Sequence, residues 1–237
     1  MSTTDTNDEL SVAHHPFRTT YPPGQFTPAG LPPYPPPPNK HTTGFKLNHM
    51  MMRIRDPQDS LHFYVTLMGM RSVFTMNTGP YTIYYLGYPS ESSRQDGKSM
   101  MSHTLGLLEL YHVHGSERQP KGYYNSGNDP ARGLGFSHLG FTVPDVRSTL
   151  KYLRANNVEV IKDVGPGTST RRTVPISEAE EKLGVGVGDY EGEVVEERGK
   201  IVELREEYTK VFDEIAFVSD PDGYTVELVP QGVDPLA

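Results

Sequence analysis

The sequence contains no cysteine and no tryptophan among its 237 residues, and it is short of basic residues. Without cysteine the protein can form no disulfide, no zinc finger and no thiol nucleophile, so any bound metal must be held by histidine and carboxylate side chains. There are 22 Lys and Arg residues against 30 Asp and Glu residues, and the net charge is −8. This acidic balance argues against nucleic acid as a partner, because binding to phosphates requires clustered basic side chains.

Long hydrophobic runs are also missing. No stretch approaches the roughly 18 consecutive apolar residues that a membrane-spanning helix needs. The N-terminus carries Asp5, Asp8 and Glu9, where a secretion or transit signal would have basic residues followed by an apolar stretch. We therefore expect no membrane partner and a cytoplasmic location.

Proline is concentrated at the N-terminus, where residues 1–40 contain ten of the 21 prolines. This stretch has few large aliphatic residues, so it cannot bury enough apolar surface to offset the entropy cost of ordering its backbone. We expect residues 1–44 to form a disordered, proline-rich leader. A role as a ligand for an aromatic-grooved adaptor domain stays open.

Residues 45–115 have the pattern of one strand, one helix and three strands. The run FKLNHMMMRI, which begins at Phe45, is strand-like, and Asp56 followed by Pro57 supplies a helix cap and a first-turn proline. Three further strand-like runs follow, RSVFTM, YTIYYLGY and HTLGLLELYHV, with turn or loop residues between them. The pattern predicts a βαβββ module.

The same order of elements occurs again in residues 136–231, after a linker at 116–135. FSHLGFTV is strand-like, Asp145 can cap a helix, and three strand-like runs follow: NNVEVIKDV, EIAFVSD and GYTVELV. An acidic insertion at 166–212 interrupts this second module, and residues 232–237 form a tail. The sequence therefore predicts an internal repeat and an α+β fold, in which two βαβββ modules form curved mixed sheets.

Counting confirms that the two halves share one register. In each half the helix-capping aspartate follows a strand histidine, His49 or His138, by seven residues. The last strands place Glu109 and Glu227 at matching positions, 60 residues after the first histidine and 89 residues after the second. The excess of 29 residues falls in the acidic insertion.

The acidic insertion has no clear strand pattern. Residues 178–207 contain eleven carboxylates against four Lys or Arg residues. We expect a surface excursion with one short helix at 196–208. An unstructured insertion and a functional lid are both compatible with this composition.

The repeat places two histidines and two glutamates at equivalent points, and these types together form a metal-binding set. Imidazole with carboxylate suits zinc, nickel, cobalt, manganese or iron, and two identical half-sites would leave two of six positions open for water or substrate. A glutamate among leucines or valines on a core strand must be paired, protonated or metal-bound to avoid a large desolvation cost. We therefore take His49, Glu109, His138 and Glu227 as candidate ligands.

Five segments together resemble the glyoxalase I (lactoylglutathione lyase) family of the vicinal oxygen chelate superfamily. They are HMMMRIRDPQDSLHFYVTLMGM, LLELYHVHGSE, YYNSGNDPARG, FSHLGFTVPDV and SDPDGYTVELV. The resemblance covers most of residues 45–163 and 213–231, and it implies the paired βαβββ modules already expected.

The resemblance implies that His49, Glu109, His138 and Glu227 are the four metal ligands. A histidine in the first position is similar to the bacterial pattern associated with nickel or cobalt, whereas the animal zinc enzymes have glutamine there. The expected cofactor is a divalent ion: nickel, cobalt or zinc.

The resemblance also implies a reaction, the conversion of the glutathione–methylglyoxal hemithioacetal to S-lactoylglutathione through an enediolate. It makes Glu227 the main base and Glu109 its counterpart on the other face. It places Arg53 and Arg132 at the glutathione carboxylates, Arg132 two residues out of register. The sequence departs from the family at Val113, where an asparagine is usual, and in the acidic insertion, which replaces a lysine-containing loop.

These departures leave two other functions open. One is a metalloenzyme of the same fold that acts on another vicinally oxygenated compound, such as a secondary metabolite. The other is a module that binds a small molecule without catalysis. Under the resemblance the protein is expected to be a homodimer in which His49 and Glu109 of one chain meet His138 and Glu227 of the other, although pairing within one chain stays open.

Overall fold

The computed structural model describes residues 42–89, 101, 104–129, 131–168, 180 and 206–232. Almost all of the expected leader, nearly the whole tail and most of the acidic insertion lie outside the described residues. All the helices and strands given below belong to one compact unit, residues 46–234. Among the described residues, no helix is both long and apolar enough to cross a membrane.

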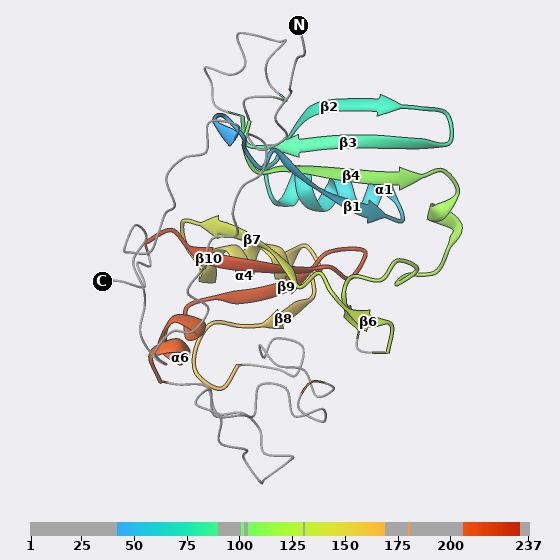
Figure 1. Cartoon of the computed structure of the whole chain (residues 1–237). Coiled ribbons are helices and arrows are strands. Elements are labelled where there is room, and N and C mark those ends of the chain that lie inside the picture. The colour runs from blue at the N-terminus through green and yellow to red at the C-terminus, as the bar shows by residue number, and fades with distance from the viewer. Residues whose placement is uncertain are drawn as a thin grey trace, which may run out of the picture. The chain divides into compact units, whose positions relative to one another are not determined.

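The first module is a four-stranded sheet with a short helix after its first strand (Figure 1). Its strands lie in the order β1-β4-β3-β2, with β1 parallel to β4 and the other pairs antiparallel. Its elements are β1 (His49–Ile54), α1 (Pro57–Leu61), the π-helix η3 (His62–Leu67), β2 (Arg71–Asn77), β3 (Tyr81–Gly87) and β4 (Leu107–Val113).

The second module repeats this topology, with strand order β7-β10-β9-β8 and β7 parallel to β10. Its elements are β7 (His138–Val143), α4 (Val146–Ala155), β8 (Val160–Lys162), α6 (Glu206–Asp213), β9 (Ala216–Ser219) and β10 (Thr225–Pro230). Between the modules lie the 3-10 helix η4 (Ser116–Arg118) and a hairpin of β5 (Asn128–Asp129) and β6 (Gly133–Leu134). The fold class predicted from the repeat, α+β with two βαβββ modules, is confirmed.

Both helix starts have the predicted caps. The Asp56 carboxylate accepts a hydrogen bond from the backbone N–H of Gln58, and Pro57 occupies the first turn. In α4 the Asp145 carboxylate accepts a hydrogen bond from the backbone N–H of Ser148. Hydrogen bonding with the side chain and with the backbone of Ser148 lowers the pKa of Asp145. The repeated aspartate therefore starts the helix at the same point of each module.

Two expected element boundaries were wrong. The first strand begins at His49 and not at Phe45, because its partner strand begins at Leu107, the residue that pairs with His49. Most of the helix expected at 196–208 lies outside the described residues, and α6, which covers Glu206–Asp213, continues five residues beyond the expected end. Its last turn buries Phe212 in an apolar cluster with residues of β8 and β9, and this packing extends the helix beyond the predicted end.

Lys162 at the end of β8 is buried, with 1% of its surface exposed. Its Nζ donates hydrogen bonds to three backbone carbonyl oxygens, those of Asp163 (3.0 Å), Phe212 (2.8 Å) and Ile215 (2.8 Å). The ammonium group also lies 4.7 Å from the centre of the Phe212 ring. Burial lowers the pKa of Lys162. The side chain therefore ties the end of α6 to β8.

The main apolar core draws on both modules. It combines side chains on the helix-facing sides of the two sheets with those of α4 and η3. Its fully buried members include Ile54, Tyr64, Leu86, Leu110, Leu150, Leu153, Val226 and Leu228. Because this side of each sheet is packed, the opposite side is the one left for a functional site.

A buried acidic group also joins the modules. The Tyr64 hydroxyl donates to Asp220 Oδ2 (2.8 Å), and the Ser60 hydroxyl donates to Asp222 Oδ2 (3.3 Å). The backbone N–H of Arg55 donates to Asp222 Oδ1 (3.0 Å). Asp220 is 5% exposed, and burial raises its pKa to about 7. These contacts join α1 and η3 to the turn between β9 and β10.

Candidate functional site

The first candidate half-site lies on β1 and β4. These strands are parallel neighbours, and their register places His49 and Glu109 diagonally on the side of the sheet away from the core. His49 Nε2 and Glu109 Oε2 are 3.2 Å apart, and the two side chains are 38% and 12% exposed. The predicted ligands of the first module are therefore adjacent and reachable from solvent.

The second candidate half-site repeats this arrangement on β7 and β10. His138 Nε2 and Glu227 Oε2 are 3.4 Å apart, and the side chains are 38% and 19% exposed. The hydrogen bond with Glu227 raises the pKa of His138 against an opposing effect of burial. The two histidine–glutamate pairs thus occupy matching places in the repeat and have nearly the same geometry.

The residue before each histidine orients its ring. The Asn48 side-chain oxygen lies 3.0 Å from His49 Nδ1, and the Ser137 hydroxyl lies 3.0 Å from His138 Nδ1. Asn48 is held in turn, because its side-chain amide donates to the backbone oxygen of Met101 at 2.7 Å. A partner on Nδ1 leaves Nε2 to act as a ligand, which is the usual arrangement of metal-bound histidines. Sequence reasoning missed both partners, although each directly precedes its histidine.

The chemistry of these pairs fits a divalent metal ion. Imidazole nitrogen and carboxylate oxygen are ligands for zinc, nickel and cobalt. Ligands that occupy neighbouring positions at 2.0–2.2 Å from one ion lie roughly 3 Å apart, which agrees with the separations of 3.2 and 3.4 Å. Each pair therefore has two side chains of suitable chemistry and spacing to contact one ion.

The four predicted ligands come together in this chain as two pairs. Within the part of the chain that the structure describes, no group of three or more His, Cys, Asp or Glu side chains is placed to hold a metal. One histidine–glutamate pair is half of the predicted ligand set.

Tyr85 is a member of the first half-site that sequence reasoning missed. It lies on β3 directly opposite Glu109 and is 7% exposed. Its hydroxyl donates to Glu109 Oε2 at 2.7 Å and lies 3.4 Å from His49 Nε2. Burial, together with the hydrogen bond to Glu109, raises the pKa of Tyr85 to about 12. Only the pairing of β3 with β4 places Tyr85 opposite Glu109, and this pairing could not be read from the sequence.

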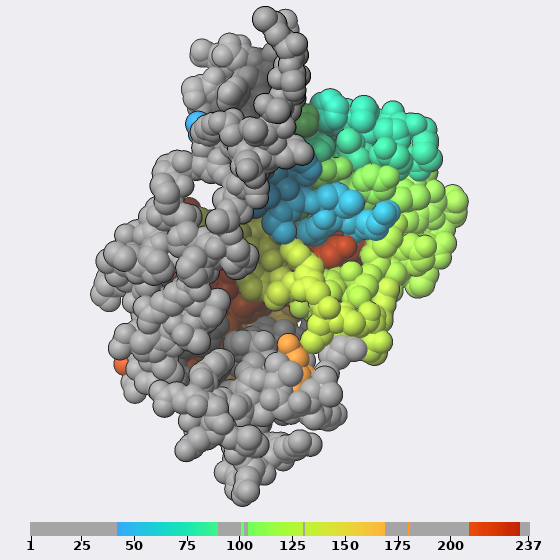
Figure 2. Space-filling model, viewed as in Figure 1, coloured from blue at the N-terminus to red at the C-terminus, as the bar shows by residue number. Residues whose placement is uncertain are grey.

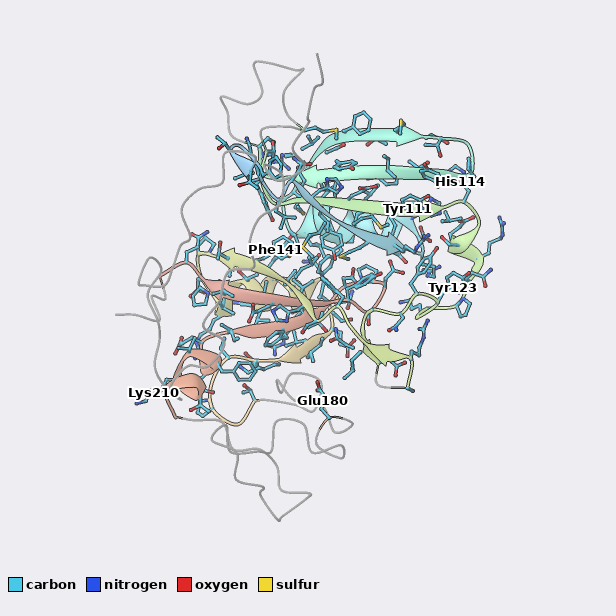
Figure 3. The ribbon with its side chains drawn as sticks, in the orientation of Figure 1. Tyr111, His114, Tyr123, Phe141, Glu180 and Lys210 are labelled. Atoms are coloured by element: carbon cyan, nitrogen blue, oxygen red, sulfur yellow. The ribbon has the colours of Figure 1, made fainter. Side chains whose placement is uncertain are left out.

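Arg53 lies on the same strand as His49, four residues further along. At about 3.3 Å per residue this places it roughly 13 Å from the histidine on the same side of the sheet. Its guanidinium group lies 5.1 Å from the centre of the Tyr111 ring, and Tyr111, labelled in Figure 3, stacks on Tyr81. Arg53 is exposed. It is therefore supported by an aromatic face and reachable by an anionic group of a ligand.

Arg132 is engaged within the chain. Its guanidinium donates to the backbone oxygens of Gly122, Tyr123 and Tyr124, a loop marked by Tyr123 in Figure 3. These hydrogen bonds give the side chain a structural role in the linker. The predicted contact with a substrate carboxylate stays a prediction, and any such carboxylate would compete with these oxygens.

The chain is similar to known proteins over most of its length. The family model of the Glyoxalase/Bleomycin resistance protein/Dioxygenase superfamily matches residues 46–181, more than half of the chain. A lactoylglutathione lyase of Pseudomonas aeruginosa is 27% identical over 198 residues, covering 81% of this chain and 86% of the relative. Glyoxalase I of Saccharomyces cerevisiae is 29% identical over 198 residues, covering 82% of this chain and 46% of the relative.

Among solved structures, glyoxalase I from Zea mays is similar over 80% of this chain and 45% of that chain, with 20% identity and a TM-score of 0.46. Glyoxalase I from Leishmania major is similar over 79% of this chain and 88% of that chain, with 22% identity and a TM-score of 0.44. This chain spans less than half the length of the yeast and maize proteins. The resemblance to the glyoxalase I family is confirmed by the family match and the relatives, and the protein belongs to the Glyoxalase/Bleomycin resistance protein/Dioxygenase superfamily.

Proposed function

We propose that this protein is a metal-dependent lyase of the glyoxalase I type that converts the glutathione–methylglyoxal hemithioacetal to S-lactoylglutathione. One observation carries the proposal: two histidine–glutamate pairs with N–O separations of 3.2 and 3.4 Å lie at matching points of a repeated module. The names of the Pseudomonas and yeast relatives support the choice of reaction.

His49, Glu109, His138 and Glu227 would hold the metal, which we expect to be nickel, cobalt or zinc. When bound, a divalent ion supplies electrostatic stabilisation to two neighbouring oxygens of the substrate as negative charge develops on them. This ligand set uses only nitrogen and oxygen atoms, in keeping with a sequence that has no cysteine.

The proton transfer is assigned to the chain's own carboxylates. Glu227 removes the proton from the carbon next to the carbonyl group and returns it to the adjacent carbon, while Glu109 serves the opposite face. A carboxylate that carries a proton from one carbon to the next must be able to shift by a short distance. Arg53 lies far enough from the half-site, roughly 13 Å, to bind a terminal carboxylate of the glutathione carrier through its guanidinium.

We further propose that the complete site forms between two chains, with His49 and Glu109 of one chain meeting His138 and Glu227 of the other. The separate pairs of the single chain support this assembly, because each pair alone provides half of the ligand set. The half-site side of the first sheet also exposes apolar residues that a second copy would cover: Met51 (49%), Phe74 (37%) and Met76 (43%). Strand β1 lies in the blue segment at the surface in Figure 2.

A second candidate function is supported by the state of Arg132. The Arg132 guanidinium donates to three backbone carbonyl oxygens. Among the described contacts, the Arg53 guanidinium has no hydrogen bond to a backbone carbonyl, so Arg53 is the predicted glutathione-binding arginine that is available to a ligand. A smaller vicinally oxygenated substrate with a single anionic group would need one arginine. The same metal and the same carboxylates would then act on a different compound.

The experiment that tests the main proposal measures metal content and hemithioacetal turnover on one preparation. The wild-type protein, reconstituted separately with nickel, cobalt and zinc, is compared with Glu227→Gln and with Glu214→Gln, which changes an exposed carboxylate after α6. We expect Glu227→Gln to keep stoichiometric metal and to lose turnover by at least about 100-fold, which is the usual contribution of a general base. We expect Glu214→Gln to match the wild type.

Three other results would redirect the proposal. Metal binding without turnover of the hemithioacetal would remove the substrate assignment and favour the second candidate. Absence of bound metal in every preparation would favour a binding module without catalysis. A sedimentation or scattering mass equal to one chain, with full metal content, would refute the intersubunit site.

A further inference from the structure

The two half-sites are unequal in one side chain. In the first module the residue of β3 opposite Glu109 is Tyr85, and in the second module the residue of β9 opposite Glu227 is Phe217. Both rings meet their histidine edge to face, with ring centres 5.0 Å apart at 75° for Tyr85 and 5.7 Å apart at 76° for Phe217. The repeat therefore keeps the aromatic ring at this position and adds a hydroxyl group to one copy only.

The hydroxyl group is placed between the two ligands of its half-site. It donates to Glu109 Oε2 at 2.7 Å and lies 3.4 Å from His49 Nε2, while those two atoms are 3.2 Å apart. A phenol that donates to a carboxylate makes a charge-assisted hydrogen bond, which is stronger than a neutral one. Since Tyr85 is 7% exposed, water does not easily replace it. The Glu109 carboxylate is therefore fixed by a group that Glu227 lacks.

The residue that pairs with each glutamate from the parallel strand on its other side also differs between the two half-sites. In the parallel register, Met51 of β1 pairs with Glu109, whereas Gly140 of β7 pairs with Glu227. A Cβ atom at position 140 would lie 3.4 Å from Glu227 Oε2, so glycine leaves open the space into which a side chain would extend. The Glu227 side chain is also more exposed than that of Glu109, 19% against 12%.

We infer that Tyr85 is a positioning residue that holds Glu109 in place as a fixed ligand, so that Glu227, beside Phe217 and Gly140, is the carboxylate free to move as the base. Tyr85 acts through Glu109 and does not itself exchange a proton with the substrate. This inference deepens the proposed function and rests on it for the catalytic half of its claim. The half that concerns metal binding does not depend on the substrate.

The test exchanges the hydroxyl group between the modules. Tyr85→Phe makes the first half-site match the second, and Phe217→Tyr makes the second match the first. Tyr84→Phe removes a hydroxyl group from the neighbouring residue of β3, whose side chain packs against the main core on the other side of the sheet, and serves as the control. Circular dichroism and thermal unfolding of each full-length variant establish that it is folded.

The first readout is the affinity of the metal-free protein for Co²⁺, followed by titration of the visible absorption of cobalt. Loss of a hydrogen-bond partner behind a metal ligand weakens binding by 10- to 100-fold in general, and we expect Tyr85→Phe to weaken it about tenfold with a changed cobalt spectrum. We expect Tyr84→Phe to bind like the wild type. Equal Co²⁺ affinity and identical spectra for the wild type and Tyr85→Phe would overturn the inference.

The second readout is the turnover of Glu109→Gln and Glu227→Gln at saturating Co²⁺, in three backgrounds. In the wild-type background we expect Glu227→Gln to lose about tenfold more turnover than Glu109→Gln, since the fixed Glu109 cannot replace the base. In the Tyr85→Phe background we expect this difference to fall to within about threefold, because the released Glu109 can move. In the Phe217→Tyr background we expect Glu227, now held, to support less turnover than in the wild type.

The outcomes separate this inference from the proposed function. A wild-type protein that binds Co²⁺ but does not turn over the hemithioacetal overturns the substrate assignment, while the Co²⁺ titration still decides whether Tyr85 positions Glu109. A wild-type protein that binds no Co²⁺ overturns both. A difference between the two glutamates that is the same with and without the Tyr85 hydroxyl group overturns the inference alone.

Discussion

Asp220 gives a quantitative test of the contact between the modules. Its carboxylate is 5% exposed and accepts hydrogen bonds from the Tyr64 hydroxyl and from the backbone N–H groups of Asp222 and Tyr224. Burial, assisted by the neighbouring charge of Asp222, raises the pKa of Asp220 from 3.8 to about 7. The perturbation is Asp220→Asn, which keeps the size of the side chain and an acceptor oxygen for the two N–H groups.

The raised pKa of Asp220 decides how the free energy of unfolding depends on pH. Because the folded protein binds this proton more tightly than the unfolded chain, the free energy of unfolding falls as the pH rises from about 4 to about 7, and the decline ends above that value. At 1.36 kcal/mol per pH unit, the full effect is on the order of 4 kcal/mol. Between pH 5 and pH 8 the wild type should lose roughly 2 to 3 kcal/mol relative to Asp220→Asn.

The assay is urea unfolding of the full chain at pH 5, 6, 7 and 8, followed by circular dichroism. All other ionisable groups are present in both proteins, so the difference between the two curves reports the Asp220 carboxylate together with its interaction with the charge of Asp222. The hydroxyl groups of Tyr64 and Tyr224 do not titrate here, because burial raises both pKa values, that of Tyr224 to about 12.

Asp145→Asn is the control for this comparison. Asp145 is exposed and its pKa is lowered, and asparagine caps helices about as well as aspartate. Its difference from the wild type should be constant between pH 5 and pH 8. A difference between the wild type and Asp220→Asn that is equally constant over this range would refute the reasoning about the buried carboxylate.

Two further predictions concern basic side chains bonded to backbone carbonyls. Lys162→Met should lower the free energy of unfolding by about 3 kcal/mol, because it removes a buried donor to three carbonyl oxygens. Chemical denaturation beside the exposed control Lys151→Met would detect this, and equal losses in the two variants would contradict it. Arg132→Ala should lower the unfolding temperature by a few degrees, as expected for the loss of about 1 kcal/mol of exposed hydrogen bonds. Its KM for the hemithioacetal should equal that of the wild type, and a large rise in KM with unchanged unfolding would support the predicted substrate contact instead.

The element pattern was predictable where a local signal was strong. Asp56 and Asp145 were expected to cap helices and do so, because a helix cap needs only the few residues that follow it. The end of α6 was predicted five residues too early. Phe212 packs in an apolar cluster with residues that are distant in sequence, and this tertiary packing stabilises the last turn of the helix. Likewise, the first strand starts where its partner starts, and no local pattern at Phe45 could show this.

The candidate site was predictable where it depends on the repeat and not where it depends on tertiary contacts. The pairs of His49 with Glu109 and of His138 with Glu227 were expected from their matching places in the repeat, and both are adjacent in the structure. The role of Arg132 in the linker was not expected, because its partners are backbone oxygens whose positions depend on the fold of the loop. Tyr85 was missed because a long segment connects β3 (Tyr81–Gly87) to β4 (Leu107–Val113), so no short turn fixes which residues of the two strands pair.

The sequence by itself determined the repeat, the type of each module and the positions of the four proposed metal ligands in the repeat, because residue type and spacing along one strand or helix do not depend on distant contacts. Tertiary structure alone decided which aromatic residue stands opposite each glutamate and which arginine is already engaged. These depend on the pairing of strands that are separated by loops of unequal length. The hydrogen bond between Tyr85 and Glu109, with Phe217 at the matching position, makes two halves that look equivalent in sequence differ in the structure.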